Sequence, residues 1–236
     1  MDSARTIALA SSCAAFVAVP CLGALLGKGE RTDRYDTVIT PPDYAFAVWG
    51  PIFAGCVAST VAQCRRQDDP MSRRTGWPLA GAYAVNTAWS VAAQSERFKL
   101  TPVLLPVATA FAAVAHGRAQ GAESQAVATP VSTGLLLGWT ALASTVNLVA
   151  GAVAAGTPKM SPKLVAASTA GLVAASAVVA ASVARSRRGA VPFAVTAAWG
   201  LATTALSRRR PRGVRVAAGA GAMAVAAGSV VSSRRG

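Results

Sequence analysis

The sequence predicts an all-α fold, a polytopic membrane helical bundle, on three observations. Of the 236 residues, 53% are hydrophobic and only 14% are charged, whereas an ordinary soluble domain is about 25% charged. The mean hydropathy is +0.44, and the apolar residues collect in long uncharged runs. These runs are rich in Ala and Leu and lack the strict alternation of a membrane β-strand, so we expect helices rather than a barrel.

Eight runs are long enough to be membrane helices, because about 17 to 25 residues cross a bilayer. They cover residues 6–27, 44–63, 77–94, 101–116, 131–155, 164–184, 189–206 and 216–231. The alternative for the first run is a cleaved signal peptide, but the run is longer than a signal-peptide core and follows a barely basic segment. The runs 101–116 and 216–231 have 16 residues each and are the weakest candidates.

The net charge of +14 invites a nucleic-acid interpretation, which the distribution of the cations argues against. A nucleic-acid domain gathers its cations on one face, whereas here they lie between the apolar runs, where they meet lipid headgroups. We therefore expect contact with the bilayer and no nucleic-acid partner. With eight spans, the loops carry 11 cations on one side and 12 on the other. This balance leaves the orientation open.

Enzymatic and metal chemistry is not indicated by the polar residues. The nine Asp and Glu residues lie in loops or at the N-terminus, and the single histidine, His116, has no Cys or carboxylate at ligand spacing. The sequence shows no Ser/His/Asp set and no paired carboxylates within a span. The cysteines occur as pairs eight residues apart within apolar runs, too far apart along one helix for a disulfide within that helix. We therefore expect neither an enzyme nor a metal protein.

Polar and aromatic residues share helix faces on two of the predicted spans. Asn86 and Trp89 are three residues apart, and Trp139, Ala143 and Asn147 are spaced by four and four, so each set lies on one face. Asparagine is costly in hydrocarbon and normally points into a bundle or a cavity. One interpretation is that these amides form interhelical hydrogen bonds beside packed Trp. The other is that they line a binding site.

The segments that contain these residues resemble the TspO/translocator protein family, also called tryptophan-rich sensory proteins. The resemblance rests on PPDYAFAVWGPIF (41–53), NTAW (86–89) and WTALASTVN (139–147), which fall in the family's order on the second, third and fifth spans. It implies a five-helix core in residues 1–156. Residues 157–236 then form a C-terminal extension of up to three transmembrane helices, similar to the longer bacterial members.

The resemblance also implies a ligand pocket inside the five-helix bundle that binds porphyrins and related tetrapyrroles. The matching positions, which the resemblance assigns to ligand binding, are Tyr44, Trp49, Asn86, Trp89, Trp139, Ala143 and Asn147, with Tyr44 near the mouth. No cofactor is required. Because no axial iron ligand lies within the slot, we expect binding without tight iron coordination. Cations of the loop after the first span, Lys28, Arg31 or Arg34, are candidates to meet ligand carboxylates.

The sequence departs from the family pattern at three places. The gap from Tyr44 to Trp49 is one residue shorter than usual, which puts the helical phase of Trp49 in question. The loop after the first span lacks the tryptophan that commonly closes the pocket, and residues 157–236 have no counterpart in the five-helix members. In the span 164–184, small residues recur at Ala167, Gly171 and Ala175 and at Ala166, Ala170 and Ala174, a pattern that allows close helix contact with the core or with another copy.

These observations favour an integral membrane ligand-binding or sensory protein that binds a porphyrin-like or other planar apolar molecule. A transporter of a small amphipathic solute is the first alternative, although no internal repeat and no ionisable group near a span centre supports it. A structural membrane subunit without a ligand is the second. We expect a multi-pass protein of a bacterial plasma membrane, with a homodimer as an open possibility.

Overall fold

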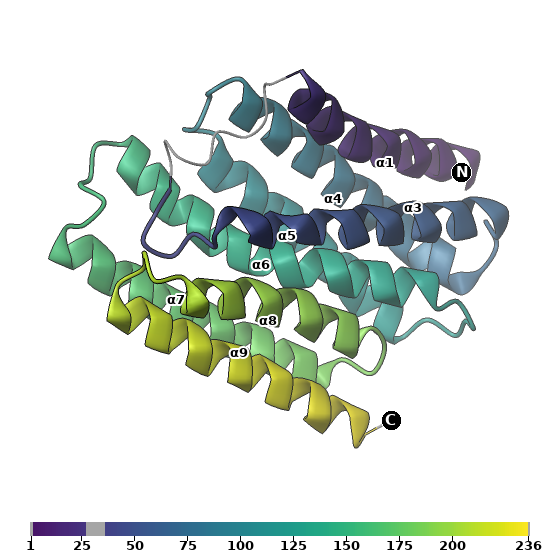
Figure 1. Ribbon diagram of the computed structural model, residues 1–236. Coiled ribbons are helices and arrows are strands. Elements are labelled where there is room, and N and C mark those ends of the chain that lie inside the picture. The colour runs from purple at the N-terminus through teal and green to yellow at the C-terminus, as the bar shows by residue number, and fades with distance from the viewer. Residues whose placement is uncertain (1, 27–35, 236) are drawn as a thin grey trace.

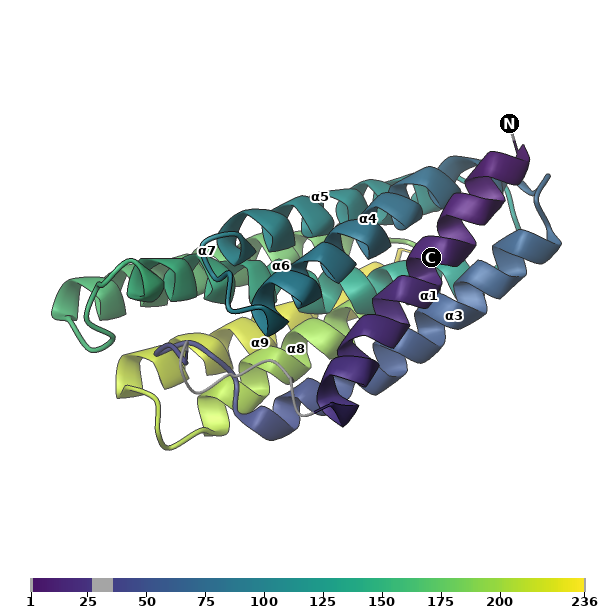
Figure 2. The same cartoon turned by 90° about the horizontal axis from the view of Figure 1, so that it is seen from above.

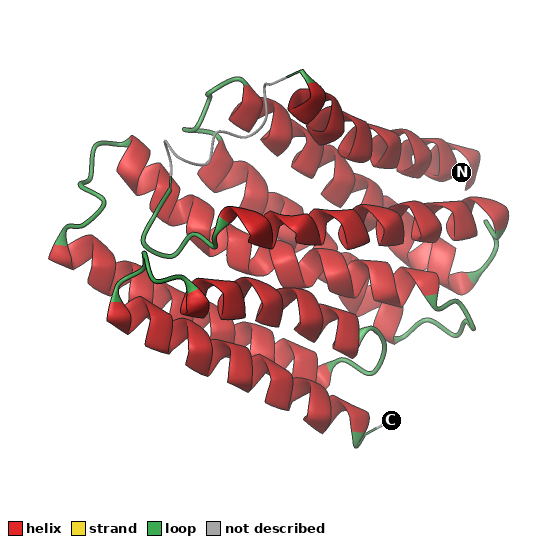
Figure 3. Ribbon diagram, viewed as in Figure 1, coloured by secondary structure: helices red, strands yellow, loops and turns green. Residues whose placement is uncertain are grey.

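The computed structural model describes residues 2–26 and 36–235, and within them the chain forms a bundle of eight α-helices and one 3-10 helix (Figures 1 and 3). The elements are α1 (Asp2–Leu25), η1 (Asp43–Val48), α3 (Trp49–Arg65), α4 (Pro70–Gln94), α5 (Thr101–Gln120), α6 (Ala128–Ala154), α7 (Pro162–Arg185), α8 (Ala190–Leu206) and α9 (Arg212–Ser233). No strand occurs in the part of the chain so described. The predicted all-α bundle is confirmed.

Six of these segments are long and apolar enough to cross a membrane, which makes the chain an integral, multi-pass membrane protein. They are α1, η1 with α3, α5, α6, α7 and α9. Of the other two helices, α8 is apolar but has 17 residues, and α4 carries Arg73 and Arg74 in its first turns before its apolar part begins.

The two weakest predicted spans are longer in the structure than their uncharged runs. α5 has 20 residues, because the helix continues past His116 to Gln120. α9 has 22 residues, because it begins at Arg212. The Arg215 Nε donates to the Ala205 carbonyl oxygen at 3.0 Å, so this cation is accommodated at the end of α8. The predicted spans were too short at both helices because they included only the uncharged runs.

α6 lies at the centre of the bundle. It packs against α3 and α5 on one side and against α7 and α8 on the other, while α9 packs against α7 and α8. α1 packs against α3 and α4 and buries Leu9, Cys13 and Phe16, so the first predicted span is part of the folded bundle. Figures 1 and 2 show α1 and α3 together on one flank and α8 and α9 together away from α1, with both chain ends at the same end of the bundle.

The C-terminal helices join the rest of the bundle through a close contact between α6 and α8. Gly134 and Gly138 lie on one face of α6, and a β-carbon on Gly138 would overlap the Thr196 hydroxyl and the Phe193 carbonyl oxygen of α8. The Thr196 hydroxyl also donates to the Leu135 carbonyl oxygen at 3.0 Å. Small residues at such a spacing let helix backbones approach closely in a membrane.

α9 completes the bundle with a regular apolar seam. Its buried residues recur at alternating spacings of four and three: Val214, Ala218, Gly221, Val225, Gly228 and Ser232. This is the heptad spacing of helices that pack side by side at a small angle. The small-residue ridges predicted on α7 contribute only in part. Gly171 and Ala175 are partly buried, whereas Ala166, Ala167, Ala170 and Ala174 are exposed.

Polar side chains fasten the α7–α8 turn to the α5–α6 loop at the end where both termini lie. His116 is buried, with its ring nitrogens 3.0 Å from the Thr133 and Ser186 hydroxyls. The Gln120 Oε1 accepts the Arg187 and Arg188 amides at 2.8 and 2.9 Å. The Arg188 guanidinium donates to three carbonyl oxygens of the loop 121–127. His116 therefore has a packing role that explains its position without a metal.

Replacing Gly138 with Ala should destabilise the protein, because the added methyl group must displace α8 from α6. We expect a loss of about 1–3 kcal/mol, the usual cost of overpacking a core, measured as a lower melting temperature in detergent. Gly117→Ala on α5 is the matched control, since a β-carbon there meets nothing within 4 Å. Helix propensity alone should make that control neutral or slightly stabilising. Equal melting temperatures for both variants would refute a tight α6–α8 contact.

Candidate functional site

Residues 36–48 form a cover over one end of the bundle, opposite the chain termini. The segment begins with a compact turn, in which the Thr37 amide donates to the Thr40 Oγ1 at 2.9 Å and the Thr40 amide to the Thr37 carbonyl oxygen at 3.2 Å. Pro41 and Pro42 follow, with Pro42 in extended conformation, and η1 then leads into α3. Thr37 and Ile39 are almost fully buried. The cover is therefore an ordered part of the bundle.

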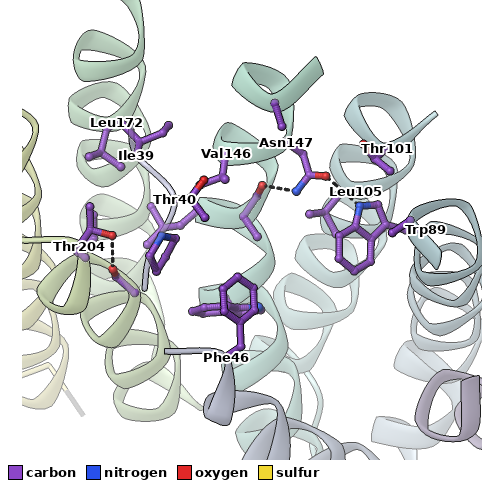
Figure 4. Close-up of a pocket in the computed structure, with 18 of the residues that line it drawn as sticks. Ile39, Thr40, Phe46, Trp89, Thr101, Leu105, Val146, Asn147, Leu172 and Thr204 are labelled. Atoms are coloured by element: carbon purple, nitrogen blue, oxygen red, sulfur yellow. Dashed lines mark hydrogen bonds between the residues drawn. The ribbon is translucent and has the colours of Figure 1, made fainter. Parts of the chain in front are cut away.

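An inner cavity of about 110 Å³ lies beneath this cover. Its wall comes from the cover and from α3 to α8, and Figure 4 shows labelled side chains of the cover, α4, α5, α6, α7 and α8 around it. Most of the wall is apolar or aromatic: Ile39, Pro41, Phe46, Trp49, Trp89, Ala93, Phe98, Leu105, Trp139, Leu142, Ala143, Val146, Ala150, Leu172, Gly200 and Leu201. The polar members are Thr40, Thr101, Asn147 and Thr204. The described wall of this cavity carries no charged side chain.

One hydrogen bond between α4 and α6 fixes the side of the inner cavity (Figure 4). The Trp89 Nε1 donates to the Asn147 Oδ1 at 2.9 Å, and the Asn147 Nδ2 donates to the Ala143 carbonyl oxygen at 2.9 Å. The indole is thereby held at one angle while its ring lines the cavity. This bond is the interhelical use of asparagine that the sequence suggested. It also places Asn147 in the cavity wall, so the two interpretations of Asn147 are compatible.

Aromatic rings form a connected group along the cover side of the cavity. Trp139 lies edge-on to Phe46 and Trp49, with ring centroids 5.5 and 6.2 Å apart. Trp49 stacks on Phe53 at 5.3 Å, with an interplanar angle of 22°. These separations are those of favourable aromatic pairs. The group leaves ring faces and edges available to a flat apolar molecule.

An outer cavity of about 430 Å³ adjoins the inner one between α1, α4 and the cover. Both cavities are lined by Phe46, Trp49 and Trp89, which stand between them. The outer wall adds Phe16, Pro20, Cys21, Ala24, Asp43, Phe53, Asn86, Ser90 and Gln94. Asn86 is 1% exposed, and its Oδ1 has no hydrogen-bond partner. Most buried acceptors in proteins have a hydrogen-bond partner, so this oxygen is an exception in the outer wall.

Six of the seven residues assigned by resemblance line these cavities. Trp49 and Trp89 line both, Trp139, Ala143 and Asn147 line the inner one, and Asn86 lines the outer one.

Tyr44 is not brought to either cavity. It is 57% exposed, and its ring lies edge-on to Trp199 at 6.3 Å. The reason is the 3-10 helix η1, which turns at a different rate from an α-helix. It leads Trp49 into the site while Tyr44 stays outside. The shortened gap from Tyr44 to Trp49 therefore leaves Trp49 at the site.

Several wall residues could not be predicted from the sequence. Phe46 lay inside the recognised motif but was not singled out, although aromatic residues are rare in this chain. Leu172, Gly200 and Leu201 come from α7 and α8, in runs where Leu and Gly are ordinary packing residues. The expected cations Lys28, Arg31 and Arg34 lie outside the described residues. Among the described residues, no three His, Cys, Asp or Glu side chains lie together in a way that could hold a metal ion.

Breaking the Trp89–Asn147 bond should cost stability without unfolding the bundle. We expect Trp89→Phe and Asn147→Leu each to lower the free energy of unfolding by about 0.6–1.7 kcal/mol, the range for such bonds in membrane proteins. The double variant should cost less than the sum of the two, because both changes remove one interaction. Thermal unfolding in detergent measures this, with Leu148→Ala on the exposed face of α6 as a control. Full additivity would show that the bond contributes nothing.

Comparison with known proteins places this arrangement in a family. The model of the TSPO-like protein family matches residues 7–231, nearly the whole chain and including α7 to α9. Searches of curated proteins and of solved structures find no match. The family match covers the motifs at 41–53, 86–89 and 139–147, which here contribute to the walls of the two adjoining cavities. The chain belongs to the TSPO-like family.

Proposed function

We propose that this membrane protein binds a planar apolar ligand, of porphyrin-like shape, in the two adjoining cavities. The main support is the partition between the cavities, which consists of the side chains of Phe46, Trp49 and Trp89. These three residues line both cavities and offer aromatic surfaces on each side. Flat aromatic ligands gain from such stacking. Asn86 adds a polar amide to the outer wall, although its Oδ1 is buried and would need a side-chain movement to meet a ligand donor.

The cavity sizes support occupancy of both cavities together by a large ligand. Typical ligand sites have volumes of about 300–1,000 Å³, so the outer cavity at about 430 Å³ falls in this range and the inner one at about 110 Å³ does not. A tetrapyrrole that enters the inner cavity has to displace the Phe46 ring from the partition. Any carboxylates of the ligand would stay outside the inner cavity, because the described part of its wall holds no cation.

We further propose a binding or sensory role without catalysis and without a required cofactor. Among the described residues, the inner wall includes no acid, base or nucleophilic thiol, whereas the outer wall includes Asp43 and Cys21. Transport of a small amphipathic solute and a ligand-free structural role are the competing hypotheses, and a homodimer in a bacterial plasma membrane is still a prediction.

Removing the Trp139 ring should weaken porphyrin binding. We expect Trp139→Ala to raise the dissociation constant for protoporphyrin by about 5- to 150-fold, which corresponds to about 1–3 kcal/mol of stacking. Tryptophan-fluorescence quenching of the purified protein measures it. Trp77→Ala is the matched control, because Trp77 is 52% exposed on α4 and lines neither cavity. Trp199 is unsuitable as a control, since its indole contacts the cover.

Comparison of these two variants distinguishes porphyrin binding at a specific site from nonspecific adsorption. Equal losses for Trp139→Ala and Trp77→Ala would indicate nonspecific partitioning of the porphyrin. Absence of saturable binding by the unmodified protein would contradict the proposal and favour the structural role.

Shortening Phe46 should increase the capacity of the site for large ligands. In Phe46→Ala the two cavities are expected to merge, so protoporphyrin should associate faster than with the unmodified protein, because the ring no longer has to move. Phe111→Ala on the exposed side of α5 is the control. Association no faster than with the unmodified protein would contradict the idea that the Phe46 ring obstructs entry to the inner cavity.

A further inference from the structure

The C-terminal helices contribute directly to the inner cavity. Leu172 of α7 and Gly200, Leu201 and Thr204 of α8 form one side of its wall. A β-carbon on Gly200 would lie 3.3 Å from Trp139 Cζ3, so the absence of a side chain there leaves room for the indole. Residues from both sides of the expected boundary at residue 156 therefore form the wall of the inner cavity.

An ion pair attaches the cover to the α8–α9 turn. Arg210 donates to both carboxylate oxygens of Asp36, at 2.6 and 2.8 Å, and to the Thr37 carbonyl oxygen at 2.8 Å. The Arg210 side chain is only 10% exposed. Bidentate guanidinium–carboxylate contacts are among the strongest hydrogen-bonded pairs in proteins. Asp36 and Arg210 are 174 residues apart in the chain, so the pair ties the start of the cover to the C-terminal helices.

A second contact attaches the other end of the cover to α8. The Trp199 Nε1 donates to the Ala45 carbonyl oxygen at 2.8 Å, and Ala45 is fully buried. The Trp199 ring also lies edge-on to Tyr44. The residues between these two attachments include Ile39, Thr40 and Pro41, which line the inner cavity. The cover cannot lift from the cavity while both contacts hold.

We propose that Arg210 and Trp199 of the C-terminal extension control access to the inner cavity by holding the cover closed. Release of the Arg210–Asp36 pair frees the turn at Thr37–Thr40, and a ligand then enters beneath Ile39 and Pro41. The C-terminal helices thereby set the rate at which a flat apolar ligand exchanges. The role in ligand entry rests on the proposed function, whereas the closed state of the cover does not.

Hydrogen exchange measured by mass spectrometry tests the closed state without any ligand. In the full-length protein in lipid nanodiscs, Arg210→Gln should speed amide exchange in residues 36–48 by about tenfold, which corresponds to 1.4 kcal/mol of opening free energy. Asp36→Asn should act alike, and the double variant should add nothing further. Trp199→Phe, which keeps a ring but loses the donor, should speed exchange in η1. Arg209→Gln is the matched control, because Arg209 is an exposed neighbour with the same charge.

Stopped-flow quenching with protoporphyrin then tests ligand entry. Arg210→Gln should raise the association and dissociation rates by about tenfold each and leave the dissociation constant nearly unchanged. Exchange in Arg210→Gln equal to that in Arg209→Gln would overturn the closed cover. Faster exchange with unchanged association would overturn the control of access. If the unmodified protein binds no porphyrin, the proposed function fails, while the exchange result still decides whether Arg210 holds the cover.

Discussion

Inside a bilayer every backbone N–H and C=O group needs a partner within the protein, and the rest of this structure depends on that constraint. Eight of the nine described elements meet it as α-helices. The cover is where the chain departs from an α-helix, and its polar groups are instead met by local bonds between Thr37 and Thr40 and by side chains from α8 and the α8–α9 turn. A cavity can persist at this end because the segment above it is held by specific bonds rather than by continuous helix packing.

The position of α6 explains why the site includes both halves of the chain. One side of α6 faces α3 and α5, the other faces α7 and α8, and the face that carries Trp139, Ala143 and Asn147 looks into the space between them. The glycines at 134 and 138 bring α8 close enough for Leu201 to reach that space. The extension is therefore integrated with the cavity at the end under the cover, and with the α5–α6 loop at the opposite end through Gln120 and Arg188.

The sequence predicted those features that follow from the cost of polar groups in lipid. Asn147 was expected to point inward, and it bonds Trp89 across α4 and α6. The sequence could not predict Leu172, Gly200 or Leu201 as wall residues, because their contacts depend on how α7 and α8 dock. It also cut α5 and α9 short, since His116 and Arg215 interrupt the uncharged runs but find partners in the structure. Tyr44 was assigned to the ligand site only because it lies in the motif, and in the structure η1 directs its side chain away from both cavities.

The central claim is that a planar ligand occupies the space lined by Trp49, Trp89 and Trp139. The indole N–H resonances of protein labelled with ¹⁵N-tryptophan test it most directly, because the chain has five tryptophans and each gives its own signal. On titration with protoporphyrin, the account predicts large saturable shifts for these three indoles and none for Trp77. Equal shifts for all five, or no saturable shift in any, would contradict it.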